Sequence, residues 1–489
     1  MSVTAISGLK DASLLRDACY INGAWIKPHG VDSQVIHNPA TQQAIGTVPY
    51  CGEVETRMAI DAAQAALPAW SALLAADRSR LMRRWFDLLI ENIDDLALIL
   101  TSEQGKPLSE ARGEVRYGAG FIEWFAEETK RIYGDIIPTY MQDRRLMVIR
   151  QPVGVVGTIT PWNFPIAMIA RKCAAALAAG CTVVSKPAPE TPFSALAMAE
   201  LAHRAGIPAG VFNVVTGDAV KIGGELTSNP VVRKISFTGS TRIGVLLASQ
   251  CTPTLKKVSL ELGGNAPFIV FDDADVDAAV QGAMISKFRN SGQTCVCTNR
   301  FIVQAGIYDE FVKRLSLAVS TLKVGNGLQA DVTQGPLITQ RAVEKVEAHV
   351  ADAVAHGAKV VLGGKRHALG GTFFEPTVIR DANTSMLMSH EETFGPVAPV
   401  FRFVTEADAL QMANESEFGL ASYLYTRDMS RAWRVSEKIE SGMVGVNVGL
   451  ISTEVAPFGG VKMSGSGREG SKYGIDDYTE IKYMCFGVE

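Results

Sequence analysis

The chain has 489 residues, of which 47% are hydrophobic and 20% are charged, and its formal net charge is −4. This composition is typical of a globular protein, and the length predicts about two to four folding units of roughly 150 residues each. The weakly negative charge and the lack of a basic stripe exclude a general polyanion binder, so no nucleic-acid partner is expected.

Eight cysteines are scattered along the chain. At this low density they predict reduced thiols rather than a disulfide framework. Residues 1–17 contain no apolar core flanked by basic residues, so no secretory signal is expected. The longest run of small apolar residues, 174–184, is about half as long as a membrane span. We therefore expect a cytoplasmic protein without a membrane partner.

Short strands and turns are expected over residues 17–48, with a hairpin at 21–25. From 54 to 133 the pattern becomes helical, and we expect Pro107 and the glycine-rich stretch 118–120 to divide it. Helices of this kind normally cover a sheet, and the pattern assigns no chemistry to them.

Residues 153–217 alternate strands with helices of similar length. This alternation predicts an α/β fold with a doubly wound parallel sheet, whose ligands bind beyond the carboxyl ends of the strands. The expected strands and helices are 154–160, 165–179, 182–187, 192–205 and 211–215.

A strand, a glycine turn and a helix follow again at 231–244. Such a turn lets the backbone approach a phosphate, and the helix N-terminus after it favours negative charge. The sequence at 465–470 also fits G-x-G-x-x-G, but it follows no hydrophobic strand and precedes no crossover unit. We therefore interpret 465–470 as a surface loop.

A second α/β alternation runs from 301 to 398. It has expected strands at 301–303 and 359–362, and the loop 390–396 interrupts it. Further strands are expected at 422–425 and 443–448. Two extended segments, 137–150 and 478–486, can each pair with another subunit or form an ordinary edge strand.

Cys295 lies in a polar, glycine-containing loop after the helical run 280–288. Arg289 places a positive charge near this thiol and favours the thiolate. Glu261, on the strand-like segment 258–264, is available as a proton acceptor, and the pair suggests covalent catalysis. A small buried thiol without chemistry is the alternative, because spacing alone does not bring the two residues together.

Seven short motifs follow one another along the chain. They are PWNFP at 161–165, KPA at 186–188, FTGST at 237–241, LELGG at 260–264, GQTC at 292–295, EETFGP at 391–396 and PFGGVKMSG at 457–465. Their order is that of the aldehyde dehydrogenase superfamily, which the chain resembles over about residues 20–489. Within that family, the segments 295–297, 449–452 and 470–475 resemble the enzymes that oxidise succinate semialdehyde most closely.

The resemblance implies a division of the chain into three parts. Residues 1–133 and 151–264 would form a dinucleotide-binding domain with the doubly wound parallel sheet, and 265–465 a second α/β catalytic domain. Residues 134–150 and 470–489 would supply a small β extension for oligomerisation, in a homodimer or a homotetramer.

The resemblance also implies a mechanism. The Cys295 thiolate attacks an aldehyde, and the Asn163 amide with the Cys295 backbone N–H stabilises the oxyanion. After hydride transfer to a nicotinamide, Glu261 activates the water that hydrolyses the thioester. Lys172 would help to relay the proton.

The resemblance implies cofactor contacts for nine residues, with plain core aromatics as the alternative for Trp162 and Phe394. NAD-preferring relatives often carry a glutamate three residues after the motif lysine, where this chain has Pro189. The missing carboxylate removes repulsion of a 2′-phosphate, so NADP is the expected cofactor and NAD a possible one. Glu190 turned into the vacated place would reverse this preference. The nine residues are Trp162, Ser185, Lys186, Pro189, Gly239, Ser240, Leu262, Glu392 and Phe394.

A guanidinium matches a substrate carboxylate with paired hydrogen bonds. The resemblance assigns this contact to Arg171, Arg289 and Ser452, with structural ion pairs as the alternative. Cys297 is a candidate for a reversible disulfide with Cys295, or else a buried thiol. We expect no metal, because no second cluster of Cys or His accompanies this pair.

Three other functions remain open. The substrate could be glutarate semialdehyde or another aldehyde, within the same fold and mechanism. A cysteine-dependent esterase or thioesterase would use Cys295 and Glu261 but would have no use for Glu392. A non-catalytic binding protein with the same fold would need neither Cys295 nor Glu261 nor Glu392.

Overall fold

The computed structural model describes residues 6–488. One half of the molecule is built on an eight-stranded sheet. The five inner strands, β9, β8, β7, β10 and β11, are parallel, whereas β1, β2 and β21 are antiparallel to their neighbours. The expected doubly wound parallel sheet is confirmed. The strand order is β2 (Ala24–Ile26), β1 (Cys19–Ile21), β9 (Phe212–Val214), β8 (Thr182–Lys186), β7 (Val155–Ile159), β10 (Val232–Thr238), β11 (Lys257–Glu261) and β21 (Gly465–Ser466).

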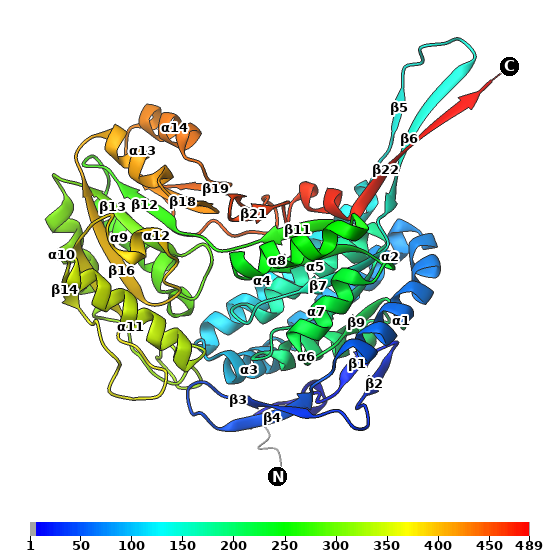
Figure 1. Cartoon of the computed structure of the whole chain (residues 1–489), viewed down its shortest axis with the longest axis horizontal. Helices are drawn as coiled ribbons and strands as arrows, with labels where there is room; N and C mark the ends of the chain where they lie inside the picture. The colour runs from blue at the N-terminus through cyan, green and yellow to red at the C-terminus, as the bar shows by residue number, and fades with distance from the viewer. Residues whose placement is uncertain (1–5, 489) are drawn as a thin grey trace.

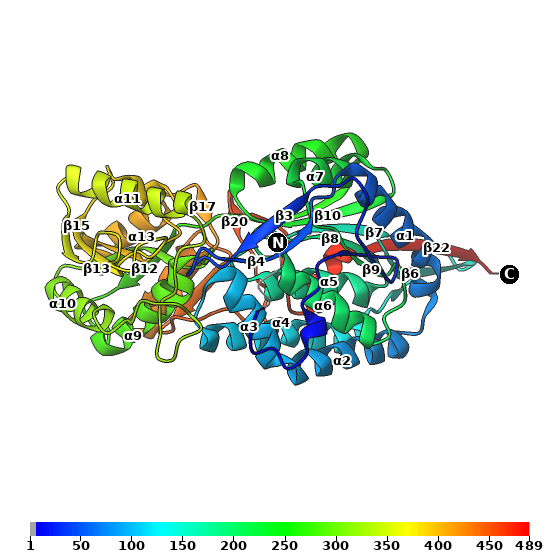
Figure 2. The same cartoon turned by 90° about the horizontal axis from the view of Figure 1, so that it is seen from below.

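Helices cover both faces of this sheet (Figure 2). A proline in the first turn starts both α5 (Pro165–Ala179) and α6 (Pro192–Arg204), where its missing N–H is not needed. Every residue of α5 is buried, because α5 lies between the sheet and a second layer of helices. That layer is α2 (Ala75–Glu91), α3 (Ile93–Gln104) and α4 (Leu108–Glu128), and the opposite face carries α1 (Glu53–Ala72), α7 (Ala219–Ser228) and α8 (Thr241–Cys251).

One expected helix break is confirmed and the other is wrong. Pro107 separates α3 from α4, but α4 continues through residues 118–120. A Cβ at Gly118 would lie 2.9 Å from the Ile166 side chain. The small residue therefore permits close packing of α4 against α5 rather than ending the helix.

The other half is built on a seven-stranded sheet with a separate core on each face. The helices α9 (Val276–Phe288) and α10 (Tyr308–Val319) cover one face, and α11 (Gln340–Ala355), α13 (Glu406–Asn414) and α14 (Met429–Lys438) cover the other. The order is β14 (Lys359–Leu362), β15 (Thr377–Ala382), β16 (Val397–Phe403), β13 (Thr298–Gln304), β12 (Ala266–Val270), β18 (Ala421–Tyr425) and β19 (Met443–Val446), which confirms the strands expected in this half.

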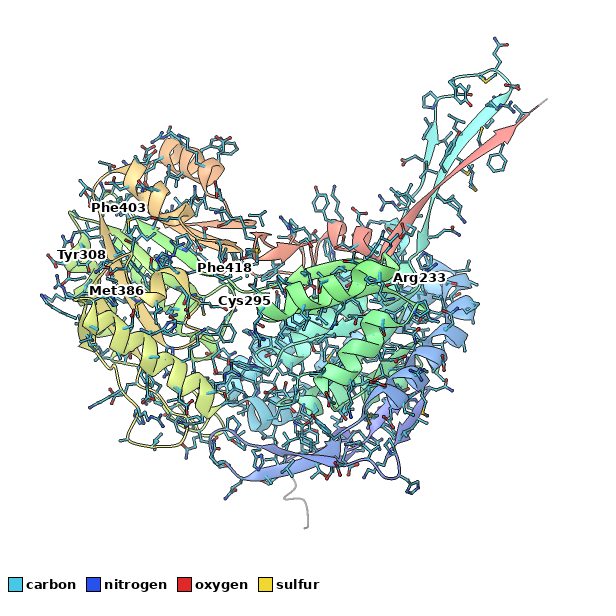
Figure 3. All side chains as sticks on the ribbon, viewed as in Figure 1. Arg233, Cys295, Tyr308, Met386, Phe403 and Phe418 are labelled. Carbon is cyan, nitrogen blue, oxygen red and sulfur yellow. The ribbon has the colours of Figure 1, made fainter. Side chains whose placement is uncertain are left out.

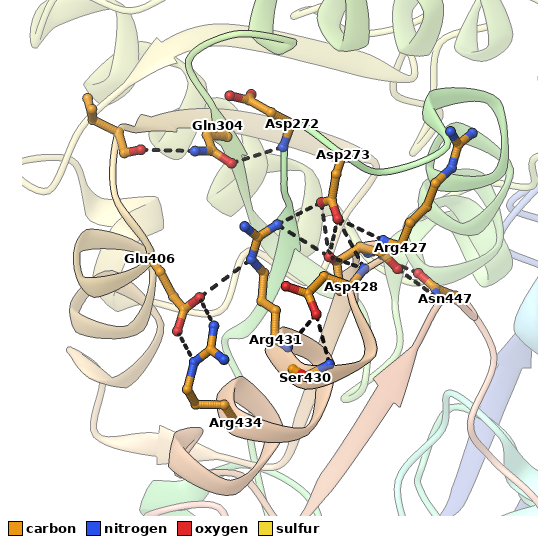
Figure 4. A network of polar contacts seen from close by, with 12 residues as sticks. Asp272, Asp273, Gln304, Glu406, Arg427, Asp428, Ser430, Arg431, Arg434 and Asn447 are labelled. Atoms are coloured by element: carbon orange, nitrogen blue, oxygen red, sulfur yellow. Dashed lines mark hydrogen bonds and ion pairs between the residues drawn. The ribbon is translucent and has the colours of Figure 1, made fainter.

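A polar network joins α13 and α14 to this second sheet (Figure 4). The Asp273 carboxylate accepts hydrogen bonds from the Thr426 hydroxyl and from Arg431, 2.8 Å away. Arg431 also pairs with Glu406, which Arg434 contacts as well. These contacts anchor the two helices.

A three-stranded sheet of β5 (Asp135–Ile137), β6 (Arg144–Pro152) and β22 (Thr479–Gly487) projects from the body (Figure 1). The two extended segments therefore pair with each other, with Thr479 opposite Pro152 and Gly487 opposite Arg144. Its surface carries exposed apolar side chains, including Ile136, which is 83% exposed. Apolar side chains on a protruding sheet are typical of a contact with another chain.

The interpretation of residues 465–470 as a surface loop is wrong. Residues Gly465–Ser466 form β21, which pairs with β11 at Leu260 and Glu261, and Glu469 is buried. The strand β21 is antiparallel and leads to the 3-10 helix η5 (Lys472–Tyr478), so the strand–turn–helix context of a nucleotide fingerprint is missing.

Within residues 6–488, no helix on its own is both long and apolar enough to cross a membrane, and only α1 and α2 joined across a 119° bend meet those criteria. The same residues contain no group of three or more His, Cys, Asp or Glu side chains placed to hold a metal ion.

Candidate active site

The predicted nucleophile and base meet between the two halves of the molecule, where Figure 3 labels the thiol. Glu261 ends β11, and Cys295 follows the 3-10 turn η4 (Arg289–Gly292) after α9. The Cys295 Sγ lies 3.7 Å from Glu261 Oε1. This distance allows a thiol proton to pass to the carboxylate.

Glu261 is held by a second set of contacts through its other oxygen. Its Oε2 accepts a hydrogen bond of 2.9 Å from the Thr238 hydroxyl and pairs with Arg171. Arg171 and its neighbour Lys172 both pair with Glu469, and their side chains are at most 1% exposed. The base is therefore linked through Arg171 to a buried carboxylate from the C-terminal part of the chain.

Lys172 does not contact Glu261, the residue it was expected to serve. Burial lowers the pKa of Lys172, and Glu469 opposes this effect. The sequence reasoning missed Glu469 because it lay in the supposed loop 465–470. The available signal was the pair of adjacent cations in an otherwise apolar helix, since buried cations need a buried anion.

Burial raises the pKa of the Cys295 thiol to about 12, and the positive charges of Arg171 and Arg289 only partly offset it. The thiol is therefore protonated at neutral pH in the protein without cofactor. Because only the thiolate is a strong nucleophile, an adjacent proton acceptor is required, and Glu261 occupies that position.

Asn163 lies beside the thiol loop, where an oxyanion donor is needed. Its Nδ2 donates a hydrogen bond of 3.0 Å to the Gln293 carbonyl. An amide nitrogen carries two hydrogens, and no second acceptor for it lies within residues 6–488. Asn163 and Cys295 both line the same cleft, so this amide lies on the wall that a ligand of the thiol would meet.

A cleft of about 600 Å³ opens above Cys295 and continues into a groove of about 360 Å³ along the first sheet. Eight of the nine predicted cofactor residues lie on these walls, and Ser185 is buried behind them. The cleft holds Trp162, Gly239, Ser240, Leu262, Glu392 and Phe394, and the groove holds Lys186 and Pro189 together with Trp162, Gly239 and Ser240.

These walls fit a dinucleotide. Gly239 and Ser240 precede the N-terminus of α8, which favours a phosphate. Lys186 donates to the Pro187 carbonyl, and no other acceptor for its three hydrogens lies within residues 6–488. Burial lowers the pKa of Lys186 to about 8 and raises that of Glu392 to about 7.

Trp162 and Phe394 contact each other edge to face, with ring centroids 5.6 Å apart. Both line the cleft instead of filling a core. Glu190 lines the cleft as well as the groove, so a carboxylate remains close to the place that Pro189 leaves without one.

The two predicted substrate arginines differ in their surroundings. Arg171 is occupied by Glu261 and Glu469, and its guanidinium lies 4.4 Å from the Phe458 ring centroid. Arg289 is half-buried over the Phe164 ring, and across residues 6–488 no carboxylate lies within 4.0 Å of it.

The two remaining predicted residues are not among those that line the cleft. Ser452 is half-buried and has no hydrogen bond to either arginine in the described chain. Cys297 is buried, its Sγ lies 3.5 Å from the Lys287 carbonyl oxygen, and burial raises its pKa.

A protein-family model described as the aldehyde dehydrogenase family matches residues 25–484, and the chain belongs to this family. The expected class of enzyme, an oxidoreductase of the aldehyde dehydrogenase type, is therefore confirmed.

Named relatives refine the comparison. The chain is 64% identical to glutarate-semialdehyde dehydrogenase of Pseudomonas aeruginosa, over 98% of this chain and 99% of that protein. It is 62% identical to an NADP(+) succinate-semialdehyde dehydrogenase of Escherichia coli, over 98% and 100%. The crystal structure of succinate-semialdehyde dehydrogenase from Burkholderia pseudomallei is 60% identical, superposes with a TM-score of 0.98, and covers 99% and 100% of the two chains.

Proposed function

We propose that this protein oxidises succinate semialdehyde to succinate, with NADP preferred over NAD. The observation that carries the proposal is the Cys295–Glu261 pair, whose thiol lines the same cleft as six of the residues predicted to bind the cofactor. The names of the relatives support the substrate and, for the Escherichia coli protein, the cofactor. Glutarate semialdehyde is the alternative substrate, supported by the Pseudomonas aeruginosa relative.

The catalytic residues act in order on the aldehyde. Glu261 removes the thiol proton, and the Cys295 sulfur bonds to the carbonyl carbon, giving a thiohemiacetal whose oxygen the Asn163 amide stabilises. A nicotinamide dinucleotide held by the eight wall residues would supply the acceptor for the hydride that leaves this carbon, and the carbon then remains bound to Cys295 as a thioester. Glu261 then removes a proton from water, and hydrolysis releases the acid and the thiol. Aldehyde, water and oxidised cofactor become carboxylate, reduced cofactor and two protons.

Protons taken up by Glu261 must leave a buried site. We propose that Lys172 assists this release electrostatically, through the Glu469–Arg171 pair that holds Glu261, because Lys172 forms no ion pair with Glu261 itself.

Cofactor contacts are assigned to the eight wall residues, with Lys186 and Glu392 on the ribose hydroxyls. NADP preference rests on Pro189, because a residue without a carboxylate does not repel a 2′-phosphate. Lys186 lines the groove together with Pro189 and would engage that phosphate, whereas Ser185 is fully buried behind this wall and does not reach it. Glu190 is the group that opposes the preference.

We assign the substrate carboxylate to Arg289, with Ser452 as a second polar contact. A guanidinium without a carboxylate partner can form two hydrogen bonds to the substrate, whereas Arg171 already contacts two protein carboxylates. Arg171 thus supports the site mainly by holding Glu261.

Three further features belong to the proposal. The protein forms a homodimer or homotetramer through the projecting sheet, whose apolar side chains are exposed. It acts in the reducing cytoplasm, in keeping with free cysteines among the described residues. Cys297 forms a reversible disulfide with Cys295 under oxidation. After inactivation by peroxide, the unchanged protein should therefore regain activity when dithiothreitol is added, whereas a Cys297→Ala variant should not.

A spectrophotometric assay of NADPH and NADH formation tests the function directly. The panel is succinate semialdehyde, glutarate semialdehyde and butanal, with Cys295→Ala as the inactive control. The highest kcat/KM is expected for succinate semialdehyde with NADP. Ester hydrolysis without NADPH formation from any aldehyde would support a cysteine esterase instead.

A further inference from the structure

The segment joining α3 to α4, to which the sequence pattern assigned no chemistry, reaches the candidate active site. The Lys106 side chain is 0% exposed. Its Nζ donates to Glu114 Oε2 at 2.5 Å and to the Asn163 carbonyl at 2.7 Å. The same ammonium lies 3.8 Å from the centroid of the Phe164 ring. Three neighbours therefore hold this buried charge, and two of them belong to the PWNFP motif.

Glu114 completes the link to α5. Its Oε1 accepts from the backbone N–H groups of Ile166 and Ala167, at 2.9 and 3.3 Å. These donors lie in the first turn of α5 and have no partner inside the helix. Glu114 therefore fixes the helix that follows Asn163, while Lys106 fixes the Asn163 carbonyl.

The same carbonyl is held from the thiol loop. Asn290, with a left-handed φ of 52°, donates from Nδ2 to the Asn163 carbonyl at 2.9 Å. Gln104 donates to the Asn290 side chain and accepts from the Lys106 N–H, each at 3.0 Å. The segment 104–114 therefore contacts both the loop of the oxyanion donor and the loop of the nucleophile.

A buried lysine–glutamate pair is a poor device for stability alone, because desolvation of two charges offsets much of their attraction. A charged donor does hold its acceptor more closely than a neutral one. Since Lys106 directs its charge at the backbone of Asn163, its geometry favours a role in aiming the Asn163 side chain.

We propose that Lys106, held by Glu114, is a positioning residue that directs the free N–H of Asn163 to the oxyanion formed on Cys295. The proposal rests on the function proposed above only for the identity of the nucleophile and the oxyanion donor. It requires no particular aldehyde and no particular dinucleotide.

A double-mutant cycle tests this role. Lys106→Met, Asn163→Ala and the double variant are compared in hydrolysis of 4-nitrophenyl acetate, which needs the thiol and the oxyanion donor but no cofactor. Loss of an oxyanion donor costs about 10²–10³ in rate, and a misdirected donor should cost about 10- to 100-fold. In the Asn163→Ala background Lys106→Met should cause less than about a twofold further loss, because the group it aims is already absent.

Three controls separate positioning from general damage. Lys106→Met should leave the Kd for NADP, measured by calorimetry, within about twofold, because the segment 104–114 does not line the groove. Lys234→Met is the matched control, because it removes another fully buried lysine. The loss of esterase rate that it causes should multiply with the loss caused by Asn163→Ala, as expected for two independent sites. If Lys106→Met does not fold, Glu114→Gln enters the same cycle, because it neutralises the partner of the ammonium.

The proposal is overturned if the folded Lys106 or Glu114 variant keeps full esterase activity. It is also overturned if the variant and Asn163→Ala lower the esterase rate independently, so that the loss in the double variant is the product of the two single losses. Failure of the proposed function gives a different result, namely no NADPH formation from any aldehyde while the esterase cycle still reports on Lys106.

Discussion

Replacing Arg289 by alanine should weaken recognition of the substrate carboxylate much more than it slows the chemistry, because Arg289 lowers the pKa of the Cys295 thiol less than Arg171 does. A hydrogen bond to a charged group contributes about 1.5–3 kcal/mol, and 1.4 kcal/mol corresponds to tenfold in affinity. Because Arg289 is half-buried, solvent screening favours the lower part of this range. The KM for succinate semialdehyde should therefore rise about 10- to 30-fold, with kcat changed less than about threefold.

The measurement compares succinate semialdehyde with butanal, which has the same four-carbon chain but no carboxylate. The KM for butanal should stay within about twofold, and Arg289→Lys should restore part of the selectivity. Arg171→Ala is the contrasting variant, because loss of the ion pair with Glu261 should lower kcat for both aldehydes. An equal rise in KM for both aldehydes in Arg289→Ala would refute the assignment of Arg289.

Four other outcomes are expected. Pro189→Glu should lower the ratio of kcat/KM for NADP to that for NAD by at least about tenfold, through like-charge repulsion of the 2′-phosphate, and an unchanged ratio would contradict this. Because the pKa of Glu392 is about 7, the KM for NADP should rise as the pH falls below that value and the carboxylate loses its charge, whereas Glu392→Gln should show no such dependence. Iodoacetamide should alkylate Cys295 in the cofactor-free protein about tenfold faster for each pH unit between about pH 7 and about pH 10, because only the thiolate reacts and the pKa of this thiol is about 12. A plateau of the rate within that interval would be inconsistent with a buried neutral thiol. Ile481→Arg, at a position 66% exposed on β22, should lower the mass in light scattering to that of a monomer, and an unchanged mass would place the subunit contact elsewhere.

Most of the fold could be predicted from local sequence patterns. The helix Pro165–Ala179 was predicted with its observed bounds, because a proline marks its first turn and Gly180, in the left-handed conformation, its end. The continuity of α4 could not be predicted in this way. Whether Gly118 breaks a helix or allows close packing depends on α5, which lies elsewhere in the sequence.

The candidate site divides in the same manner. Cys295, Glu261 and Asn163 were found because each lies in a short motif, and the structure brings the three together. Glu469 and Lys106 were missed because each acts through one distant buried contact, which leaves no periodic or local pattern. In both cases the only sequence signal was a charge placed where the fold would bury it.

The contact between Glu469 and Arg171 sets a condition on how the protein is made. The strand β21 and Glu469 are synthesised after the whole of the second sheet, yet β21 borders the strand of the base and Glu469 binds its guanidinium partner. A nascent chain that lacks them exposes the edge of β11 and leaves Arg171 and Lys172 without their shared anion. The first sheet therefore stays incomplete until the second sheet has been synthesised, and the site cannot form before both sheets are present.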